Sequence, residues 1–392
     1  MGGKGRGLVS VQEHPFADLP AALVDEVISQ ATAAGESILQ ELRRTRAERE
    51  RLRAALIEKD LIWHESRLGY PPLPTTCATD GSYAIDRLLT IALAAAAAVA
   101  MEGLTPPSET RHWEEPRHST FVAVEPHHAE TATVLRAVML GEELLLAVRA
   151  PHDVVMMDGT LTLPIIYFNQ ALNLAPETPE LKSSQQFLSR AAQFLEAYAR
   201  ILTAERSDQQ YIALPKYSTR REVGRQAGWE EGYDDRGLLT LLLQPGELTR
   251  PLPLDEPDQP WHLNIDRLPA DLREKVETLT STIVDRLSAV YVFYYRPHAW
   301  LPALRVETAS AVAANPHRLA TVVQGLKHQC ATPSMLEPFP VYLADRMVKA
   351  VARALPAFRQ VAVQRVAETY EGQIDEVFFS MHGYRTEAGG SA

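Results

Sequence analysis

Two apolar segments of this chain are each interrupted by an aspartate, a glycine and a hydroxyl residue. The first reads "TTCATDGSYAI" and contains Asp80, and the second reads "HDVVMMDGTLTLPI" and contains Asp158. A carboxylate within or at the end of a buried strand is costly unless a cation or hydrogen bonds compensate it. The glycine after each aspartate is expected to let the backbone turn and to leave room for a substrate. The two segments therefore predict a shared cation site, although Asp-Gly-Ser alone is also an ordinary turn.

A helical segment between these two strands supplies a candidate third acid. In "AETATVLRAVMLGEELLLAVRAP", Glu143 shares one face with Leu140 and Ala147 by i+3/i+4 spacing. Glu142 projects about 100° away from it. Glu143 is the favoured inward residue, and Glu142 stays open as the alternative. Aspartate, glutamate and aspartate in this order suit Mg²⁺ or Mn²⁺, which prefer carboxylate oxygens, and two such ions can flank a scissile phosphate.

The order of the elements predicts an α/β fold. After a Pro-containing linker at residues 69–76, strand-like segments and helical segments alternate, and the first strands are expected to form antiparallel hairpins. We expect one mixed sheet flanked by helices. The Ala-rich run "LLTIALAAAAAVAMEGL" holds about 14 apolar residues, fewer than the roughly 20 that a membrane-spanning helix needs. A buried strand or helix is expected there, and no membrane segment.

The N-terminal region is expected to be one long helix. The Arg-rich stretch "ELRRTRAERERLRAALIEKD" indicates either a solvated, salt-bridged face or an arm that docks on a protein or on DNA. Seven apolar residues fall on one heptad register, which favours an assembly role; they are Val24, Ile28, Ala31, Ile38, Leu42, Leu52 and Leu56.

Charge and cysteine content exclude little. A net charge of −11 is not typical of a nucleic-acid-binding protein, but it does not exclude a groove with local basic charge. Cys77 and Cys330 fit neither a zinc spacing nor a disulfide framework, and "MGGKGRGLVS" lacks the apolar core of a signal peptide. These features predict a cytoplasmic protein. There is no Ser/His/Asp or Cys/His pattern of a side-chain nucleophile, which agrees with metal-dependent chemistry.

The chain resembles the NurA nuclease family. The resemblance runs from about Thr76 to Leu355 and rests on several stretches in order: "ATDGSY", "EELLLA" ahead of "VVMMDGTL", "IALPKYS", "DDRGLLTLLLQPGE", "YVFYYRPHAWLPALRVE" and "PFPVYLADRMVKAV". It implies an RNase H-like sheet, a manganese-dependent active site, and 5′-to-3′ exonuclease and single-strand endonuclease activity on DNA. It also implies a homodimer that docks on the hexameric ATP-driven translocase HerA in DNA-end processing.

The resemblance also implies the metal ligands. The family's first aspartate, glutamate and second aspartate fall on Asp80, Glu143 and Asp158. The family usually has a histidine in its last helix, where this chain reads "YLADRMV" and has Asp345. We interpret Asp345 as a substituting ligand. The alternative is a solvated aspartate paired with Lys349 at i+4, in which case one metal ion is held less tightly.

Two basic residues are candidate substrate contacts. Lys216 ends "YIALPK" and is expected either at a strand end, where it meets a DNA phosphate, or as an exposed surface lysine. Arg305 and Glu307 in "LRVE" alternate on a strand and point to one face. They form either a structural ion pair, which we favour, or a part of the substrate channel.

Four regions are expected along the chain. Residues 1–20 form a flexible N-terminus, residues 21–68 a helical extension for assembly, residues 69–385 the NurA nuclease domain, and residues 386–392 a flexible tail.

The expected reaction is two-metal phosphodiester hydrolysis. Asp80 is expected to bridge two ions, Asp158 to hold one, and Glu143 and Asp345 to complete the coordination. Two other functions stay open. One is a NurA-like subunit that guides DNA or regulates a HerA-type motor without cutting, and the other is an RNase H-like enzyme that acts on RNA or on a hybrid.

Overall fold

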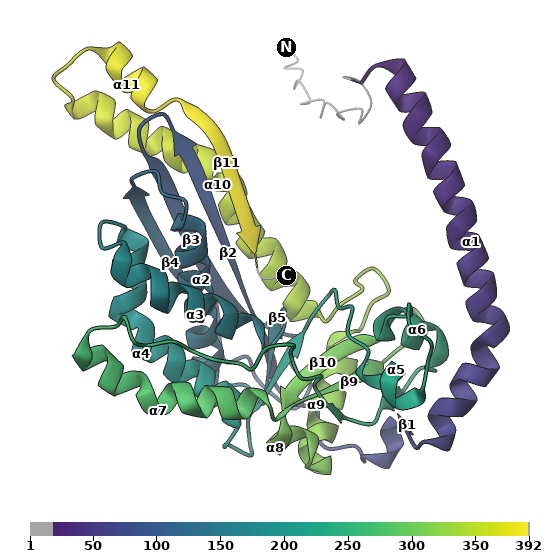
Figure 1. Cartoon of the computed structure of the whole chain (residues 1–392). Coiled ribbons are helices and arrows are strands. Elements are labelled where there is room, and N and C mark those ends of the chain that lie inside the picture. The colour runs from purple at the N-terminus through teal and green to yellow at the C-terminus, as the bar shows by residue number, and fades with distance from the viewer. Residues whose placement is uncertain (1–18, 391–392) are drawn as a thin grey trace, which may run out of the picture. The chain divides into compact units, whose positions relative to one another are not determined.

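A computed structural model describes residues 19–390 of the protein (Figure 1). By its internal contacts the chain divides into two units, residues 1–54 and residues 55–392. The helix α1 (Ala21–Glu58) makes up the described part of the first unit and continues into the second. It confirms the long N-terminal helix. Of the predicted flexible segment 1–20, residues 1–18 lie outside the described part of the chain.

The second unit is built on one mixed sheet with the strand order β1-β7-β9-β10-β6-β5-β2-β3-β4, while β8 pairs with β9 and β11 with β2. Neighbours β2, β3 and β4 are antiparallel, whereas β2, β5 and β6 run parallel. Antiparallel hairpins followed by parallel strands confirm the predicted mixed sheet. The strands are β1 (Ile62–His64), β2 (Thr76–Leu88), β3 (Ala92–Glu102), β4 (Arg117–Glu125), β5 (Val154–Asp158), β6 (Gln210–Leu214), β7 (Glu247–Thr249), β8 (Leu252–Pro253), β9 (Val290–Arg296), β10 (Leu304–Ala309) and β11 (Gly383–Gly390).

Helices cover both faces of the sheet. Figure 1 shows α2, α3, α4 and α7 on one side and α10 on the other. One large hydrophobic core fills the first face, and a second core together with two small clusters under α10 fills the other. The covering helices are α2 (Thr131–Arg149), α3 (Leu163–Leu174), α4 (Lys182–Thr203), α7 (Ala270–Leu287), α9 (Pro316–Gln329) and α10 (Phe339–Thr369). The short helices are α5 (Glu222–Ala227), α6 (Asp235–Leu242), α8 (Ser310–Ala313) and α11 (Ile374–Ser380).

The Ala-rich run is the buried strand β3. Ala94, Ala96 and Ala98 lie in the core that α2 covers, while Ala95 packs with Leu355 of α10 on the opposite face. Burial on both faces explains why the strand shows no polar alternation. The methyl side chains are small enough for a helix to approach closely on each side. No helix within residues 19–390 is both long and apolar enough to cross a membrane.

The structure places the outer boundaries differently from the sequence prediction. Strand β1, at residues 62–64, pairs with β7 and so belongs to the sheet rather than to the helical extension. Leu56 and Leu61 are buried as well. At the other end, the segment from residue 386 to Gly390 forms part of β11, which pairs with β2. Residues 391–392 lie outside the described part.

Candidate metal centre

Asp80 lies where β2 changes neighbours. Residues 76–79 pair with the parallel strand β5, whereas residues 82–88 pair with the antiparallel strand β11. Strand β5 ends at Asp158, beside this change of neighbour. Both aspartates are almost fully buried, at 2% exposure for Asp80 and 5% for Asp158. The sheet topology therefore brings the two Asp-Gly segments to one place.

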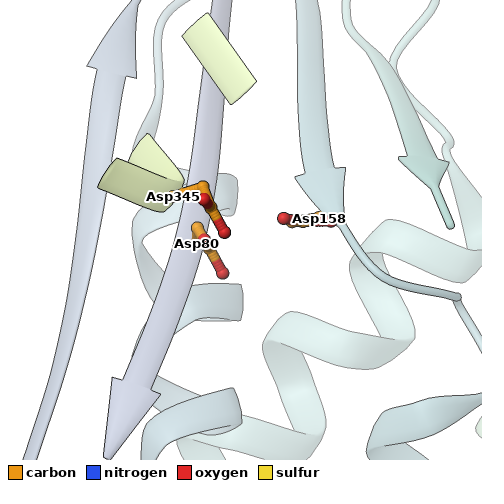
Figure 2. Close-up of side chains that lie close together, drawn as sticks. All are labelled: Asp80, Asp158 and Asp345. Carbon is orange, nitrogen blue, oxygen red and sulfur yellow. The ribbon is translucent and has the colours of Figure 1, made fainter. Parts of the chain in front are cut away.

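A third aspartate joins them from the opposite helix layer. Asp345 extends from α10, and the carboxylates of Asp80, Asp158 and Asp345 each offer an oxygen within 4.8 Å of the other two. Figure 2 shows the three side chains pointing into one common space. Asp158 Oδ1 is buried and receives no hydrogen bond from residues 19–390. Three hard oxygen donors, one with an unmatched lone pair, fit a divalent cation such as Mg²⁺ or Mn²⁺.

Glu143 faces the same cluster from α2. Its Oε2 atom lies 3.4 Å from the position that a Cβ atom would take at Gly81, directly after Asp80. This oxygen is buried and receives no hydrogen bond from the described residues. Burial, reinforced by the negative charges of Asp80 and Asp158, raises the pKa of Glu143 well above its usual value. Glu143 lies next to the triad of aspartates but is not one of the three mutually close carboxylates.

Glu142 is turned away from the aspartates. It accepts a hydrogen bond from Ser119 Oγ at 2.7 Å and forms an ion pair with Arg190 of α4. Its oxygens are therefore occupied between β4 and α4. The two adjacent glutamates face different neighbours, as helical geometry requires.

The two glycines have different roles, which corrects the single role predicted for both. Gly159, with φ of +94°, turns the backbone directly after Asp158. Gly81 instead continues the extended strand β2. A Cβ atom at Gly81 would lie 2.8 Å from Met139 Cγ, so the glycine leaves room for α2 rather than for a substrate.

Lys216 lies within the cluster, two residues after β6. Its Nζ is 2.7 Å from Asp158 Oδ2, 3.4 Å from Asp345 Oδ1 and 3.2 Å from Glu337 Oε2. Burial alone lowers the pKa of Lys216, but the charge of Asp158 and the neighbouring carboxylates outweigh it, so the pKa is raised. The ammonium is therefore held in its charged form. Contact with a DNA phosphate stays a prediction.

Glu337 is a further acid that the sequence did not reveal. It stands in the loop just before α10, and burial, together with Asp158 and Asp345, raises its pKa even against the opposing charge of Lys216. A lone glutamate in the loop segment "SMLEPFP" follows no periodic pattern. Its only signal is that it directly precedes the helix that carries Asp345.

Both interpretations of Asp345 describe part of what the structure shows. Its carboxylate belongs to the triad, and its Oδ1 also lies 2.7 Å from Lys349 Nζ at i+4. Lys349 is largely exposed, so this ion pair is weak. The pairing with Lys349 and a ligand role are therefore compatible.

Arg305 is a buried structural cation. It is 1% exposed and donates to both carboxylate oxygens of Glu222 at 2.8 Å, to Glu307 at 3.0 Å and to Tyr294 Oη at 2.7 Å. Glu307 in turn accepts a hydrogen bond at 3.0 Å from the backbone N–H of Leu161, in the loop that follows Asp158. Arg305 thus supports the loop of the metal centre from behind, as the favoured structural interpretation requires.

Several solved structures resemble the fold of this chain. The NurA nuclease from Sulfolobus solfataricus superposes with a TM-score of 0.58 at 14% identity, covering 89% of this chain and 99% of that chain. The chain has the fold of the NurA nucleases. A NurA structure with manganese gives 0.53 at 13% identity, covering 88% of this chain and 99% of the other. A NurA structure bound to dAMP and manganese gives 0.53 at 12%, covering 90% and 99%.

No protein-family model matches the sequence, and no curated protein matches it. At identities of 12–14% the likeness to the NurA structures is a likeness of fold. Any function has to be argued from the site itself.

Proposed function

We propose that the protein is a divalent-metal-dependent DNA nuclease. The main support for this proposal is the triad of Asp80, Asp158 and Asp345, whose carboxylates each offer an oxygen within 4.8 Å of the other two in a NurA fold. Mn²⁺ is the proposed ion, since two similar NurA structures are described with manganese, and Mg²⁺ is the alternative. DNA is proposed as the substrate class from the likeness to the NurA nucleases, one of which is described with bound dAMP.

Each residue has a stated part in the proposed reaction. Asp80, Asp158 and Asp345 would hold the divalent ions, and Glu143 would complete the donor set once ionised. Two bound divalent ions would activate water and offset the charge of the leaving oxygen. Lys216, fixed by Asp158, would place a positive charge beside the phosphate. Arg305 would act indirectly: it binds Glu307, which holds the loop after Asp158.

The finer parts of the proposal come from the resemblance to the NurA family. They are 5′-to-3′ exonuclease and single-strand endonuclease activity, a homodimer, a HerA-type hexameric ATPase as partner, a role in DNA-end processing, and a cytoplasmic location. Helix α1 supports an assembly role, because Ile28, Ile38 and Leu42 of its heptad register are 50–62% exposed. Replacing Ile38 and Leu42 by serine in the full chain should weaken self-association or stimulation of the motor's ATPase. Unchanged sedimentation and unchanged ATPase stimulation would show that α1 has no role in assembly.

A subunit that guides DNA without cutting it is the second candidate. It is favoured by the two lysines at Asp345, because Lys216 and Lys349 compete with a metal ion for that carboxylate. Such a subunit should change the motor's ATPase activity yet leave DNA intact with Mn²⁺. Competition between DNA and RNA of one sequence separates both candidates from an enzyme that acts on RNA.

The test is a pair of substitutions with a matched control. Asp158→Asn and Asp80→Asn remove a charge from the triad and should lower Mn²⁺-dependent DNA cleavage about a thousandfold, a loss of several kcal/mol of electrostatic stabilisation. Asp258→Asn, on an exposed loop, should cut like the unchanged protein. Full cleavage by Asp80→Asn or Asp158→Asn would reject the proposed site, and circular dichroism should show an unchanged fold.

A further inference from the structure

A cavity of about 300 Å³ lies next to the triad of aspartates. Lys216 and Glu337 line it and also contact the metal centre through the ion pairs of Lys216. The cavity is formed by the end of β6, by α6, by the segment before and into β10, and by the start of α10.

Most of the lining is apolar, and the polar groups are few. Seven of the lining residues are leucine, proline or valine, which offer a surface for a flat apolar ring. Tyr217 lines the same cavity although its side chain is 88% exposed. An aromatic ring in that position can stack on a nucleobase, because every base has a π-face.

Arg236 is the unmatched cation of this cavity. It lies on α6, is half-buried, and its Nε donates to the carbonyl oxygen of Ala303 at 3.3 Å. Burial lowers its pKa, so the charged form is penalised where it stands. It forms no ion pair with any carboxylate in residues 19–390. Arg305, which lines the same cavity, has all its charge matched by Glu222 and Glu307.

A half-buried guanidinium without a carboxylate suits a phosphate, which it can bind with two parallel hydrogen bonds. Apolar walls and an exposed aromatic ring suit a base. One nucleotide carries both chemistries, and the shared Lys216 and Glu337 connect the cavity directly to the metal centre. A nucleotide seated there is adjacent to a phosphate held at the aspartates.

We propose that this cavity binds the nucleotide next to the scissile bond, with its base on the apolar wall and Tyr217, and its other phosphate on Arg236. The proposal rests on the proposed nuclease function and deepens it. At a strand end that second phosphate is the terminal monoester, and within a strand it is a diester. Arg236 is thus a specificity-determining residue that does not touch the metal ions.

The first experiment measures binding without catalysis. Isothermal titration with dAMP and with deoxyadenosine is done in EDTA, so that no divalent ion attracts the phosphate. The unchanged protein should bind dAMP more tightly than deoxyadenosine. Arg236→Gln should weaken dAMP binding about 10- to 100-fold and leave deoxyadenosine binding unchanged, as expected for one hydrogen-bonded charge. Tyr217→Ala should weaken both ligands, because it removes a contact with the base.

Controls and kinetics complete the test. Arg149→Gln, on the exposed end of α2, should behave like the unchanged protein in every assay. Arg236→Lys keeps the charge but loses the two-pronged geometry, so its dAMP affinity should be intermediate. With a short DNA substrate and Mn²⁺, Arg236→Gln should raise KM at least fivefold while kcat changes less than threefold. Equal thermal unfolding midpoints will show that the variants are folded.

Two results would overturn the cavity proposal. One is dAMP binding by Arg236→Gln that equals that of the unchanged protein. The other is dAMP binding by the unchanged protein that is undetectable or no tighter than deoxyadenosine binding. Failure of the nuclease proposal would give a different result. The protein would then cut DNA without dependence on Asp80 and Asp158, or would not cut DNA at all, whether or not it binds dAMP.

Discussion

Two clusters of charged side chains, the Arg305 cluster and the aspartate cluster, lie near the loop that follows Asp158, and their charges are satisfied in different ways. In the Arg305 cluster, the guanidinium donates to Glu222, Glu307 and Tyr294. In the aspartate cluster, Lys216 is the one cation that contacts more than one of the described carboxylates, and Asp158 Oδ1 receives no hydrogen bond from residues 19–390. Asp80 and Asp158 are as buried as the residues of the Arg305 cluster, whereas Lys216 and Asp345 are partly exposed.

The difference teaches how to tell a structural cluster from a site. A buried charge network that is complete in itself fixes the position of the backbone and has nothing left to bind a ligand. A network with buried, unmatched carboxylate oxygens is stable only with an added cation or proton. Burial and the charges of Asp80 and Asp158 raise the pKa of Glu143, so a proton on Glu143 is one way to relieve the unmatched negative charge. A divalent ion is the other.

The largest expected effect comes from breaking the complete cluster. Arg305→Met leaves Glu222 and Glu307 buried without their cation and should reduce the free energy of unfolding by about 3–5 kcal/mol. The measurement is urea denaturation followed by circular dichroism. An effect below about 1 kcal/mol would show that the cluster is not structural and would reopen a substrate role for Arg305.

Metal addition should act on the other cluster. Mn²⁺ at a hundred times its dissociation constant should stabilise the unchanged protein by about 2.7 kcal/mol, because only the folded state offers the site. Asp158→Asn should lose this stabilisation, and its stability without metal should equal or exceed that of the unchanged protein. The measurement is the thermal unfolding midpoint with Mn²⁺ and with EDTA. Equal Mn²⁺ stabilisation of Asp158→Asn would contradict the ligand assignment.

A buried histidine, His152, should have a smaller effect on stability, and this effect depends on pH. His152 is 1% exposed, and burial, against the opposing charge of Glu102, lowers its pKa from 6.5 to about 4. The folded state then binds fewer protons than the unfolded state between these two values. Stability is full above pH 6.5 and falls as pH drops towards 4, by about 2 kcal/mol at pH 5.

The control for this effect is a variant without the titrating ring. His152→Gln should remove most of the difference between unfolding free energies measured by urea denaturation at pH 7 and pH 5. If the unchanged protein loses no stability over this range, His152 is charged and paired with Glu102, whose Oε1 lies 3.5 Å from its Nε2. It would then resemble the Arg305 cluster instead.

Periodicity and residue type predicted the main elements of the fold. The Ala-rich run, expected as a buried strand or helix, is the strand β3, and α2 follows its helical spacing. These features are local, so the sequence displays them. The pairing of β11 with β2 joins segments about 300 residues apart and is not visible in any short window.

The site was predicted to the extent that its residues lie on regular elements. Asp80, Asp158 and Glu143 stand on strands or on a helix face with a readable orientation, and the structure places them around one space. Glu337 and Arg236 could not be predicted in the same way. Their importance depends on which distant carboxylates surround them, and that is a property of tertiary contacts.

The origin of the three aspartates in the chain has a consequence for protein synthesis. Asp80 comes from the second strand, whereas Asp345 comes from the last long helix, and 264 residues lie between them. A ribosome adds about 5–20 residues each second, so the first aspartate waits many seconds for the third. A nascent or prematurely terminated polypeptide that stops before α10 has no complete cation site. Under the proposed function, the cell is therefore not exposed to DNA cleavage by half-made copies of the enzyme.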